Sequence, residues 1–379
     1  MSKSPSDVLE PPSTSLRAHN YRWRIARSKG ISRYWIRTAF GAEAWLARKE
    51  DPPATDSTII QISTTLHIRS TGISQVHLEY WIARALVHLR FHRPEVACQV
   101  SRPRYYDYPG CPSEIVYIMA KNAADVAAWV SRTFRRAIPL CDGLGQASTL
   151  KLTNKDILPL SSFKIHCGVN TRDEKAELEV GSRVILVFTF RPVLWDSVSS
   201  HIFVGDLLRC TGQLWSAEAQ RWDALWQYDW GTETDNLPKS LLEACVTDVS
   251  AIGHDFARTR DGYMRKLQEG ASGWGLPVSN ARGRQQVIQC SLNVSQSQDL
   301  MLAVKHFCGP DYTLTHLGHA AMLLALLRVS PVPPDFPSSA PVVSPMLING
   351  RRYLKGEDDD RRYGSCLASA FVDFAPLGQ

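Results

Sequence analysis

The 379-residue sequence lacks the features that mark secreted and membrane proteins. Its nine cysteines are odd in number and widely spaced, with no CxxC pair, unlike the disulfide frameworks of small secreted domains. Residues 1–14 are polar and rich in serine and proline, without the apolar stretch of a signal peptide. The longest apolar helix candidate, residues 320–327, is too short to span a bilayer. We therefore expect a soluble, reduced, cytoplasmic protein with no membrane span.

The sequence also has no large excess of charge of either sign. The net charge is +6 and the charged fraction is 21%, which is ordinary for a globular protein. Basic and aromatic residues interleave over residues 21–37, as they can on a nucleic-acid-binding surface, but no recognised nucleic-acid module accompanies them. We expect a solvated basic surface here and no nucleic-acid partner. The length suits two domains, or one domain of two lobes.

Several common catalytic and cofactor motifs are missing. There is no GxSxG nucleophile elbow. Gly143 and Gly145 lack the third glycine of a dinucleotide fingerprint. Neighbours on a strand point to opposite faces, so His166 and Cys167 do not suggest a thiol–imidazole pair. Three histidines and a cysteine in the C-terminal part of the sequence are possible zinc ligands: His306, Cys308, His316 and His319. Their spacing is not that of a zinc finger or a zinc protease, so we expect no metal.

What the sequence does contain is a mixture of strand and helix patterns. Residues 60–68 alternate strictly, which predicts a half-buried strand. Ser74 is a candidate N-cap for a helix whose apolar face would carry Val76, Tyr80, Ala83 and Val87. The other predicted strands are residues 115–119, 184–190, 287–292, 346–348 and 368–374, with an extended segment at 193–204, and the other predicted helices are residues 126–134, 206–215 and 313–328.

Strands and helices alternate without a regular βαβ rhythm. This order favours an α/β sandwich with mixed sheets over a doubly wound parallel fold. Residues 222–275 read as loop-rich, and residues 331–345 as a proline-rich surface loop. In the helix predicted over residues 313–328 we expect Leu314, Leu317 and Leu324 to be buried.

The segment Ser200-His201-Ile202-Phe203-Val204-Gly205-Asp206 carries the clearest chemical signal. It follows two extended stretches and precedes a predicted helix. A histidine at the end of a strand can act as a general base, because histidine exchanges protons near neutral pH. Taken alone, a single histidine in a loop is more often structural.

This segment resembles the HHxxxDG motif of the chloramphenicol-acetyltransferase-like superfamily, which includes peptide-synthetase condensation domains and plant and fungal alcohol acyltransferases. His201 matches the second, catalytic histidine, Ser200 replaces the first, and the final Asp-Gly is transposed as Gly205-Asp206. Three further segments resemble the fungal trichothecene-type acetyltransferases in the same order: residues 89–97, residues 313–322, and residues 349–354 with 363–366.

The resemblance implies a two-lobed sandwich whose second lobe is incomplete. Its expected parts are a polar N-terminal segment (1–30), an N-terminal lobe ending in the histidine motif (31–220), a loop-rich connection (221–285) and a partial C-terminal lobe (286–379). It also implies an O-acyltransferase of fungal secondary metabolism that moves an acyl group from acyl-CoA to a hydroxyl or amine of a small molecule. His201 would be the general base, supported by Ser200, Gly205 and Asp206, with no bound cofactor.

Two departures from the family pattern leave alternatives open. The motif aspartate of the family is mainly structural and pairs with an arginine elsewhere, and Gly205 stands at its expected place. The chain also stops at Gln379, where family members continue. A catalytically inactive remnant, a binding scaffold of the same fold, or a cyclase reusing the cleft would each fit these departures. An uncovered sheet edge would further predict an oligomer.

Overall fold

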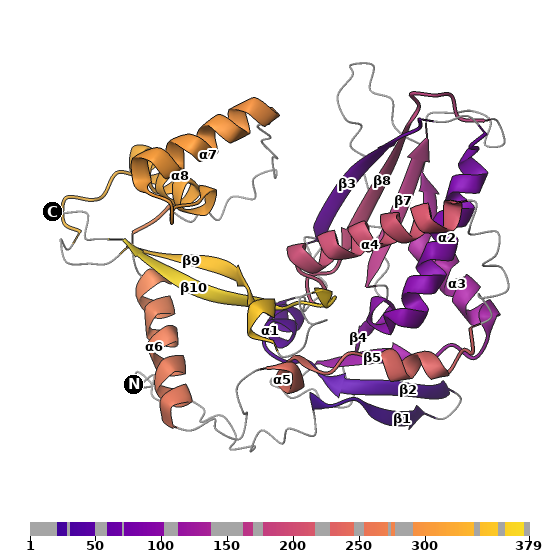
Figure 1. Cartoon of the computed structure of the whole chain (residues 1–379). Coiled ribbons are helices and arrows are strands. Elements are labelled where there is room, and N and C mark those ends of the chain that lie inside the picture. Colours follow the sequence, from indigo (N-terminus) through magenta and orange to yellow (C-terminus); the bar gives the residue numbers. More distant parts are fainter. Residues whose placement is uncertain are drawn as a thin grey trace, which may run out of the picture. The chain divides into compact units, whose positions relative to one another are not determined.

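The chain divides into two structural units in the computed structural model (Figure 1). Unit 1 comprises Met1–Ala251 and Ile348–Ala368, and unit 2 comprises Ile252–Leu347 and Ser369–Gln379. The structure describes residues 21–28, 31–49, 59–69, 72–101, 113–137, 162–169, 177–216, 228–245, 254–271, 274–276, 291–336, 342–354 and 361–374.

Two sheets form the framework of unit 1, and each has four strands within the described residues. One sheet is antiparallel, in the order β1-β2-β5-β4. The other, in the order β3-β8-β7-β6, is mixed, because β6 and β7 run parallel while its other pairs are antiparallel. The strands are β1 (Arg24–Ser28), β2 (Ile31–Thr38), β3 (Ile60–His67), β4 (Gln99–Ser101), β5 (Glu114–Ile118), β6 (Phe134–Ala137), β7 (Phe163–Val169) and β8 (Arg183–Phe190).

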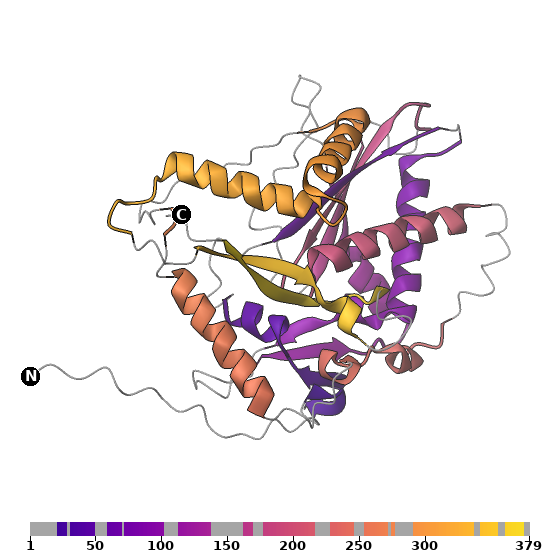
Figure 2. The same cartoon turned by 60° about the vertical axis from the view of Figure 1, so that its left-hand side comes forward.

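Helices α2 and α4 pack against each other and contribute to the core of unit 1 (Figure 2). Strand β8 is buried along most of its length, because its apolar side chains lie within this core. Phe163, Phe190, Trp195 and Phe203 form an aromatic cluster with ring centroids 4.7–5.9 Å apart. The helical segments of the unit are α1 (Ala42–Lys49), α2 (Gln75–His92), η2 (Pro94–Ala97), α3 (Ala123–Thr133), α4 (Ser197–Trp215), η5 (Thr232–Asn236), α5 (Leu241–Ala244) and η7 (Gly350–Tyr353).

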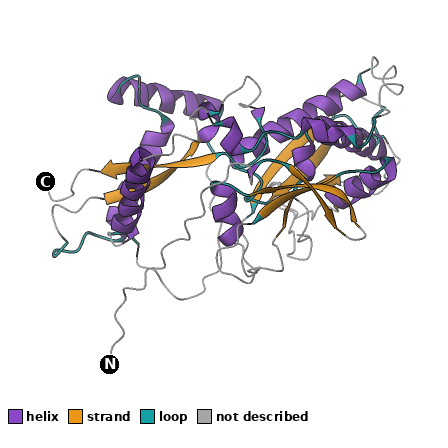
Figure 3. Ribbon diagram, turned by 90° about the horizontal axis from the view of Figure 1, so that it is seen from below, coloured by secondary structure: helices purple, strands orange, loops and turns teal. Residues whose placement is uncertain are grey.

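Unit 2 is mainly helical. Figure 3 shows helix α6 beside the strands nearest the C-terminus, and the ring of Tyr263 on α6 lies 4.6 Å from that of Phe371 on β10. Its elements are α6 (His254–Ala271), α7 (Val294–Cys308), α8 (Leu314–Val329), and most of the paired strands β9 (Val342–Asn349) and β10 (Leu367–Phe374). No helix in the described ranges combines the length and apolar character needed to cross a bilayer.

Many predicted elements are confirmed. The strands predicted at residues 60–68, 115–119, 184–190 and 368–374 correspond to β3, β5, β8 and β10, and Ser74 caps α2 by accepting a hydrogen bond from the His77 backbone N–H at 3.3 Å. The mixed sheets and the α/β class are confirmed as well. Most of the strand predicted at residues 287–292 lies outside the described residues.

Three predictions about helices are wrong. Helix α6 occupies residues that were expected to be loop-rich. The buried face of α2 is formed by Leu78, Ile82, Leu86 and their neighbours, whereas Val76 and Tyr80 are exposed. Helix α8 forms as predicted, but Leu314, Leu317 and Leu324 are exposed, because a helix that is apolar on every side does not reveal from sequence which face is buried.

Candidate active site

The largest correction concerns the segment around His201. Residues 193–204 were expected to be extended and a helix was expected from Asp206. Instead β8 ends at Phe190, a tight turn follows, and α4 begins at Ser197. In that turn the backbone N–H groups of Leu194 and Trp195 both donate to the Arg191 carbonyl at 3.1 Å. His201 therefore lies on a helix and not at the end of a strand.

A capping box at Asp196 explains why α4 begins where it does. One carboxylate oxygen of Asp196 accepts a hydrogen bond from the Ser199 backbone N–H at 2.7 Å, and the Ser199 hydroxyl accepts one from the Asp196 N–H at 2.9 Å. These bonds satisfy backbone donors that a helix N-terminus otherwise leaves unpaired. The Ser200 hydroxyl donates to the Asp196 carbonyl at 2.7 Å, so it serves the same junction.

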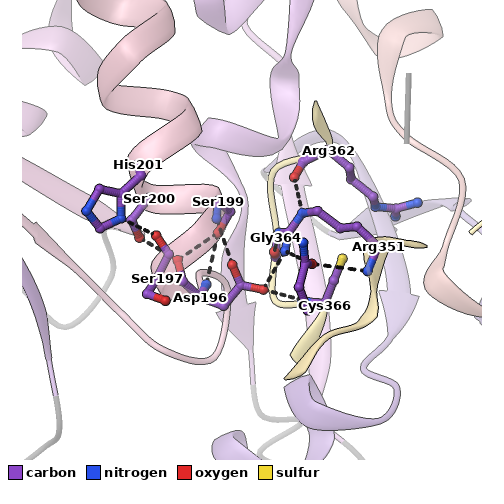
Figure 4. A network of polar contacts seen from close by, with 10 residues as sticks. Asp196, Ser197, Ser199, Ser200, His201, Arg351, Arg362, Gly364 and Cys366 are labelled. Atoms are coloured by element: carbon purple, nitrogen blue, oxygen red, sulfur yellow. Dashed lines mark hydrogen bonds and ion pairs between the residues drawn. The ribbon is translucent and has the colours of Figure 1, made fainter. Parts of the chain in front are cut away.

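The second carboxylate oxygen of Asp196 holds a segment far along the chain (Figure 4). It accepts a bond from Arg351 Nη1 at 2.8 Å and another from the Cys366 backbone N–H at 2.7 Å. The side chains of this ion pair are 0% and 1% exposed. A buried charge is tolerated only when it is paired and hydrogen-bonded, so we expect the loss of either partner to destabilise unit 1 strongly.

Arg351 is held on its other side by backbone carbonyls. Its Nε donates to the Arg362 carbonyl at 3.0 Å and its Nη2 to the Gly364 carbonyl at 2.6 Å. The Arg351 guanidinium thus links the start of α4 to residues 349–354 and to residues 361–366. The planar guanidinium, with its fixed set of donors, suits this role better than a lysine would.

Gly350 allows Arg351 to reach this position. A Cβ atom at residue 350 would lie 2.6 Å from the Cys366 carbonyl oxygen, closer than such atoms approach each other. We expect Gly350→Ala to lower the free energy of unfolding by about 1–3 kcal/mol, the usual cost of overpacking. Gly205→Ala is the matched control, because Gly205 lies inside α4 with open space around it, and it is expected to be stabilising by about 0.5–1 kcal/mol. Urea unfolding of both variants measures the difference, and equal stability of the two would contradict the packing argument.

His201 is exposed on α4, and its ring is oriented by its own helix (Figure 4). Nδ1 lies 2.6 Å from the Ser197 carbonyl oxygen. A carbonyl only accepts hydrogen bonds, so Nδ1 is the protonated nitrogen of the neutral ring and Nε2 keeps its lone pair. This is a tautomer that a general base can use.

Gly205 and Asp206 lie within α4 and make no turn, which corrects the expectation for that pair. Asp206 instead contacts residues near the end of the described chain: one carboxylate oxygen accepts from the Tyr363 hydroxyl at 2.8 Å, and the other pairs with Arg361 and with Arg209. The structure thus contains two aspartate–arginine contacts between α4 and the C-terminal part of unit 1, at Asp196 and at Asp206. The Asp196 contact is the fully buried one.

Sequence reasoning missed Asp196 and Arg351. A signal for the N-cap was present, since three of the four residues after Asp196 are serines, but the apolar residues 193–195 before it resembled a continuing strand. If Asp196 is the aspartate of an HHxxxD pattern, the two histidine positions fall at Arg191 and Pro192. Neither residue offers an imidazole.

The other candidate groups are either buried thiols that stay protonated or a histidine that already takes part in a helix cap. Burial raises the pKa of the Cys167 thiol to about 12 and that of Cys366 to about 11, so neither is a thiolate at neutral pH. His316 Nδ1 accepts the Thr313 backbone N–H at 3.1 Å, as part of the cap of α8.

Comparison with known proteins places this architecture in a family. The family model described as 15-O-acetyltransferase Tri3 matches residues 11–379. The chain is 26% identical over 370 residues to the trichothecene O-acetyltransferase TRI3 of Trichoderma arundinaceum, covering 96% of this chain and 69% of that protein. It is also 26% identical over 380 residues to the trichothecene 15-O-acetyltransferase TRI3 of Fusarium sporotrichioides, covering 98% and 70%.

Solved structures agree on the fold. The structure of TRI3 trichothecene 15-O-acetyltransferase from Fusarium sporotrichioides superposes with a TM-score of 0.81 at 24% identity, over 95% of this chain and 68% of that one. The first condensation domain of the calcium-dependent antibiotic synthetase gives a TM-score of 0.50 at 13% identity, over 88% and 68%. The predicted likeness to acetyltransferases and condensation domains is thereby confirmed. The chain belongs to the Tri3 15-O-acetyltransferase family of fungal secondary metabolism, whose relatives are O-acetyltransferases with this α/β fold.

Proposed function

We propose that this chain transfers an acetyl group from acetyl-CoA to a hydroxyl group of a trichothecene-type alcohol in the cytoplasm. The observation that carries the proposal is the family match over residues 11–379, supported by relatives named as trichothecene O-acetyltransferases. The buried contact between Asp196 and Arg351 supports the acetyltransferase fold, because the superfamily resemblance implies a structural aspartate–arginine pair. It does not support His201 as the base, since this pairing puts Pro192 at the position of the catalytic histidine.

In this proposal His201 is the general base. Its Nε2 removes the proton of the acceptor hydroxyl while the hydroxyl oxygen forms a bond to the thioester carbonyl carbon. The carbon–sulfur bond then breaks, and the same nitrogen returns the proton to the departing thiolate. Support comes from the orientation of the ring by the Ser197 carbonyl and from its exposure. Ser200 and Asp206 support the position of α4, Ser200 by bonding to the Asp196 carbonyl and Asp206 by bonding to Tyr363. Gly205 lies inside the helix with open space around it.

The test is direct. The purified chain is incubated with acetyl-CoA and a trichothecene alcohol, free CoA thiol is followed over time, and the product is examined by mass spectrometry for one added acetyl group. The proposal predicts CoA release that depends on both the alcohol and the protein. Absence of alcohol-dependent CoA release and of acetylated product contradicts it.

A second function, binding without turnover, is favoured by one observation. If Asp196 is the motif aspartate, Pro192 occupies the position of the catalytic histidine, and proline has no group that can exchange a proton. Such a chain would keep the fold and bind its ligand without catalysing transfer. Binding of the alcohol or of acetyl-CoA by calorimetry, with no CoA release in the assay above, is the outcome expected for this function.

A further inference from the structure

The C-terminal end of α2 carries aromatic and imidazole rings that hold a later segment of the chain. Phe91 on α2 stacks on Tyr228, with ring centroids 4.4 Å apart and an interplanar angle of 23°. The Tyr228 hydroxyl lies 2.8 Å from Nδ1 of His88, and Trp230 makes a T-shaped contact with Phe91 at 5.5 Å between ring centroids. Residues 228–230 are thus attached to α2 by two ring contacts and one hydrogen bond.

The chain that follows residues 228–230 is fixed independently. Glu233 is fully buried, and its carboxylate accepts hydrogen bonds from the Tyr117 hydroxyl at 2.9 Å and from the Ala120 backbone N–H at 3.2 Å. Gly231, whose backbone N–H donates to the same carboxylate, marks the boundary between the two attachments. Its φ of 118° lies in the region that favours glycine. Residues 228–230 can therefore move away from α2 while Glu233 stays in place.

The surroundings of His88 disfavour a positive charge on its ring. His88 is half-buried, and the ring of His92, one helical turn later, lies 4.4 Å away between centroids. Burial keeps the two neutral neighbours uncharged, because it raises the pKa of the Tyr228 hydroxyl and raises that of the Cys210 thiol on α4 to about 12. The charged groups around the cluster are Arg84, which acts on Tyr228, Arg93, which acts on His92, and the exposed Asp229.

These surroundings make the attachment sensitive to pH. Burial lowers the pKa of His88 from its ordinary value of 6.5 to about 4, and the neighbouring His92 adds to the effect. Burial, together with the charge of Arg93, also lowers the pKa of His92. A histidine whose pKa is lowered in this way contributes stability that is fully present above about 6.5 and is lost as the pH falls towards about 4. Because Tyr228 contacts His88 directly, part of that contribution belongs to the attachment of residues 228–230.

We propose that residues 228–230 form an acid-sensitive clasp on α2, attached while His88 is neutral and detached when its imidazole takes up a proton. The only covalent change is the new N–H bond of the imidazole. Detachment leaves the Phe91 ring without its stacking partner and so alters the surface at this end of α2. The clasp does not involve His201, and it does not depend on the proposed function.

The test is fluorine NMR of the full chain labelled with fluorotyrosine, recorded between pH 7 and pH 4.5. The signal of Tyr228 is identified by its loss in Tyr228→Phe. We expect the detached fraction, read from this signal, to rise about tenfold or more over the interval, because each unit by which a pKa is lowered changes the equilibrium up to tenfold. The signal of Tyr117 should not change, since it is buried beside the fixed Glu233.

Variants separate His88 from the other histidines. His88→Phe keeps a ring at the position and removes the titration, so the Tyr228 signal should become independent of pH. His88→Gln should do the same, and it keeps the test usable if the phenylalanine variant folds poorly. His77→Gln is the matched control, because His77 is an exposed histidine on the same helix, and the response of Tyr228 should equal that of the wild type.

Three results would overturn the clasp. The first is a Tyr228 signal that stays constant between pH 7 and pH 4.5 in the wild type. The second is an equal response in His88→Phe or His88→Gln, which would assign the titration to another group. The third is a simultaneous change of the Tyr117 signal, which would show general unfolding by acid. A response confined to Tyr228 that is abolished only by the His88 variants supports the proposal.

Discussion

Asp196→Ala is expected to lower the free energy of unfolding by about 3–5 kcal/mol, the usual result of removing one partner of a buried ion pair. The loss is large because Arg351 would remain 1% exposed without its anion, and because the N–H groups of Ser199 and Cys366 would lose their acceptor. Unfolding in urea, followed by tryptophan fluorescence, measures the change.

Two further variants separate the ion pair from general damage. Arg24→Ala breaks a half-exposed ion pair with Glu114, 3.1 Å long, and should cost no more than about 1 kcal/mol. Combining Asp196→Leu with Arg351→Met removes both charges, and it should recover part of the stability that either change alone loses. An Asp196→Ala protein as stable as Arg24→Ala would show that the contact between Asp196 and Arg351 contributes little to the free energy of unfolding.

The elements that could be predicted from sequence are those with a strong local pattern. Strand β3 alternates residue by residue, and α2 is preceded by Ser74, the serine that caps it. Strand β8 is a run of β-branched and aromatic residues. In each case the residues that determine the structure are neighbours in the chain.

The start of α4 could not be predicted in the same way. The apolar residues 193–195 continue the character of β8, but they form a turn whose carbonyl acceptor is Arg191. The capping box then uses Ser199 where glutamate or glutamine is more usual. The sequence argument for His201 and Gly205 assumed a turn at these residues, and the structure has a helix there instead.

The candidate site depends on contacts that no local pattern reveals. Asp196 and Arg351 are 155 residues apart, and Asp206 meets Tyr363 across 157 residues. The resemblance at residues 349–354 and 363–366 indicated that these segments matter, but not that they close around the start of α4. Only the fold brings them together.

His201→Ala is expected to have the largest effect on activity. Loss of a general base typically lowers the rate by about 10²–10⁴. Because His201 is exposed and its contact is with its own helix, the substitution should leave the urea midpoint nearly unchanged. His77→Ala is the matched control, since His77 is also an exposed helical histidine, on α2, and its turnover should equal that of the wild type.

The rate of alcohol-dependent CoA release by wild type and His201→Ala, measured side by side, tests the central claim most directly. Acetyl transfer with His201 as the base predicts measurable turnover by the wild type and a loss of about 10²–10⁴ in the variant, with binding of the alcohol retained. Equal turnover by the two proteins would contradict the role of His201. No turnover by either protein would contradict acetyl transfer itself and would favour binding without catalysis. That outcome is expected if Asp196 is the motif aspartate, because Pro192 then stands where the catalytic histidine should be.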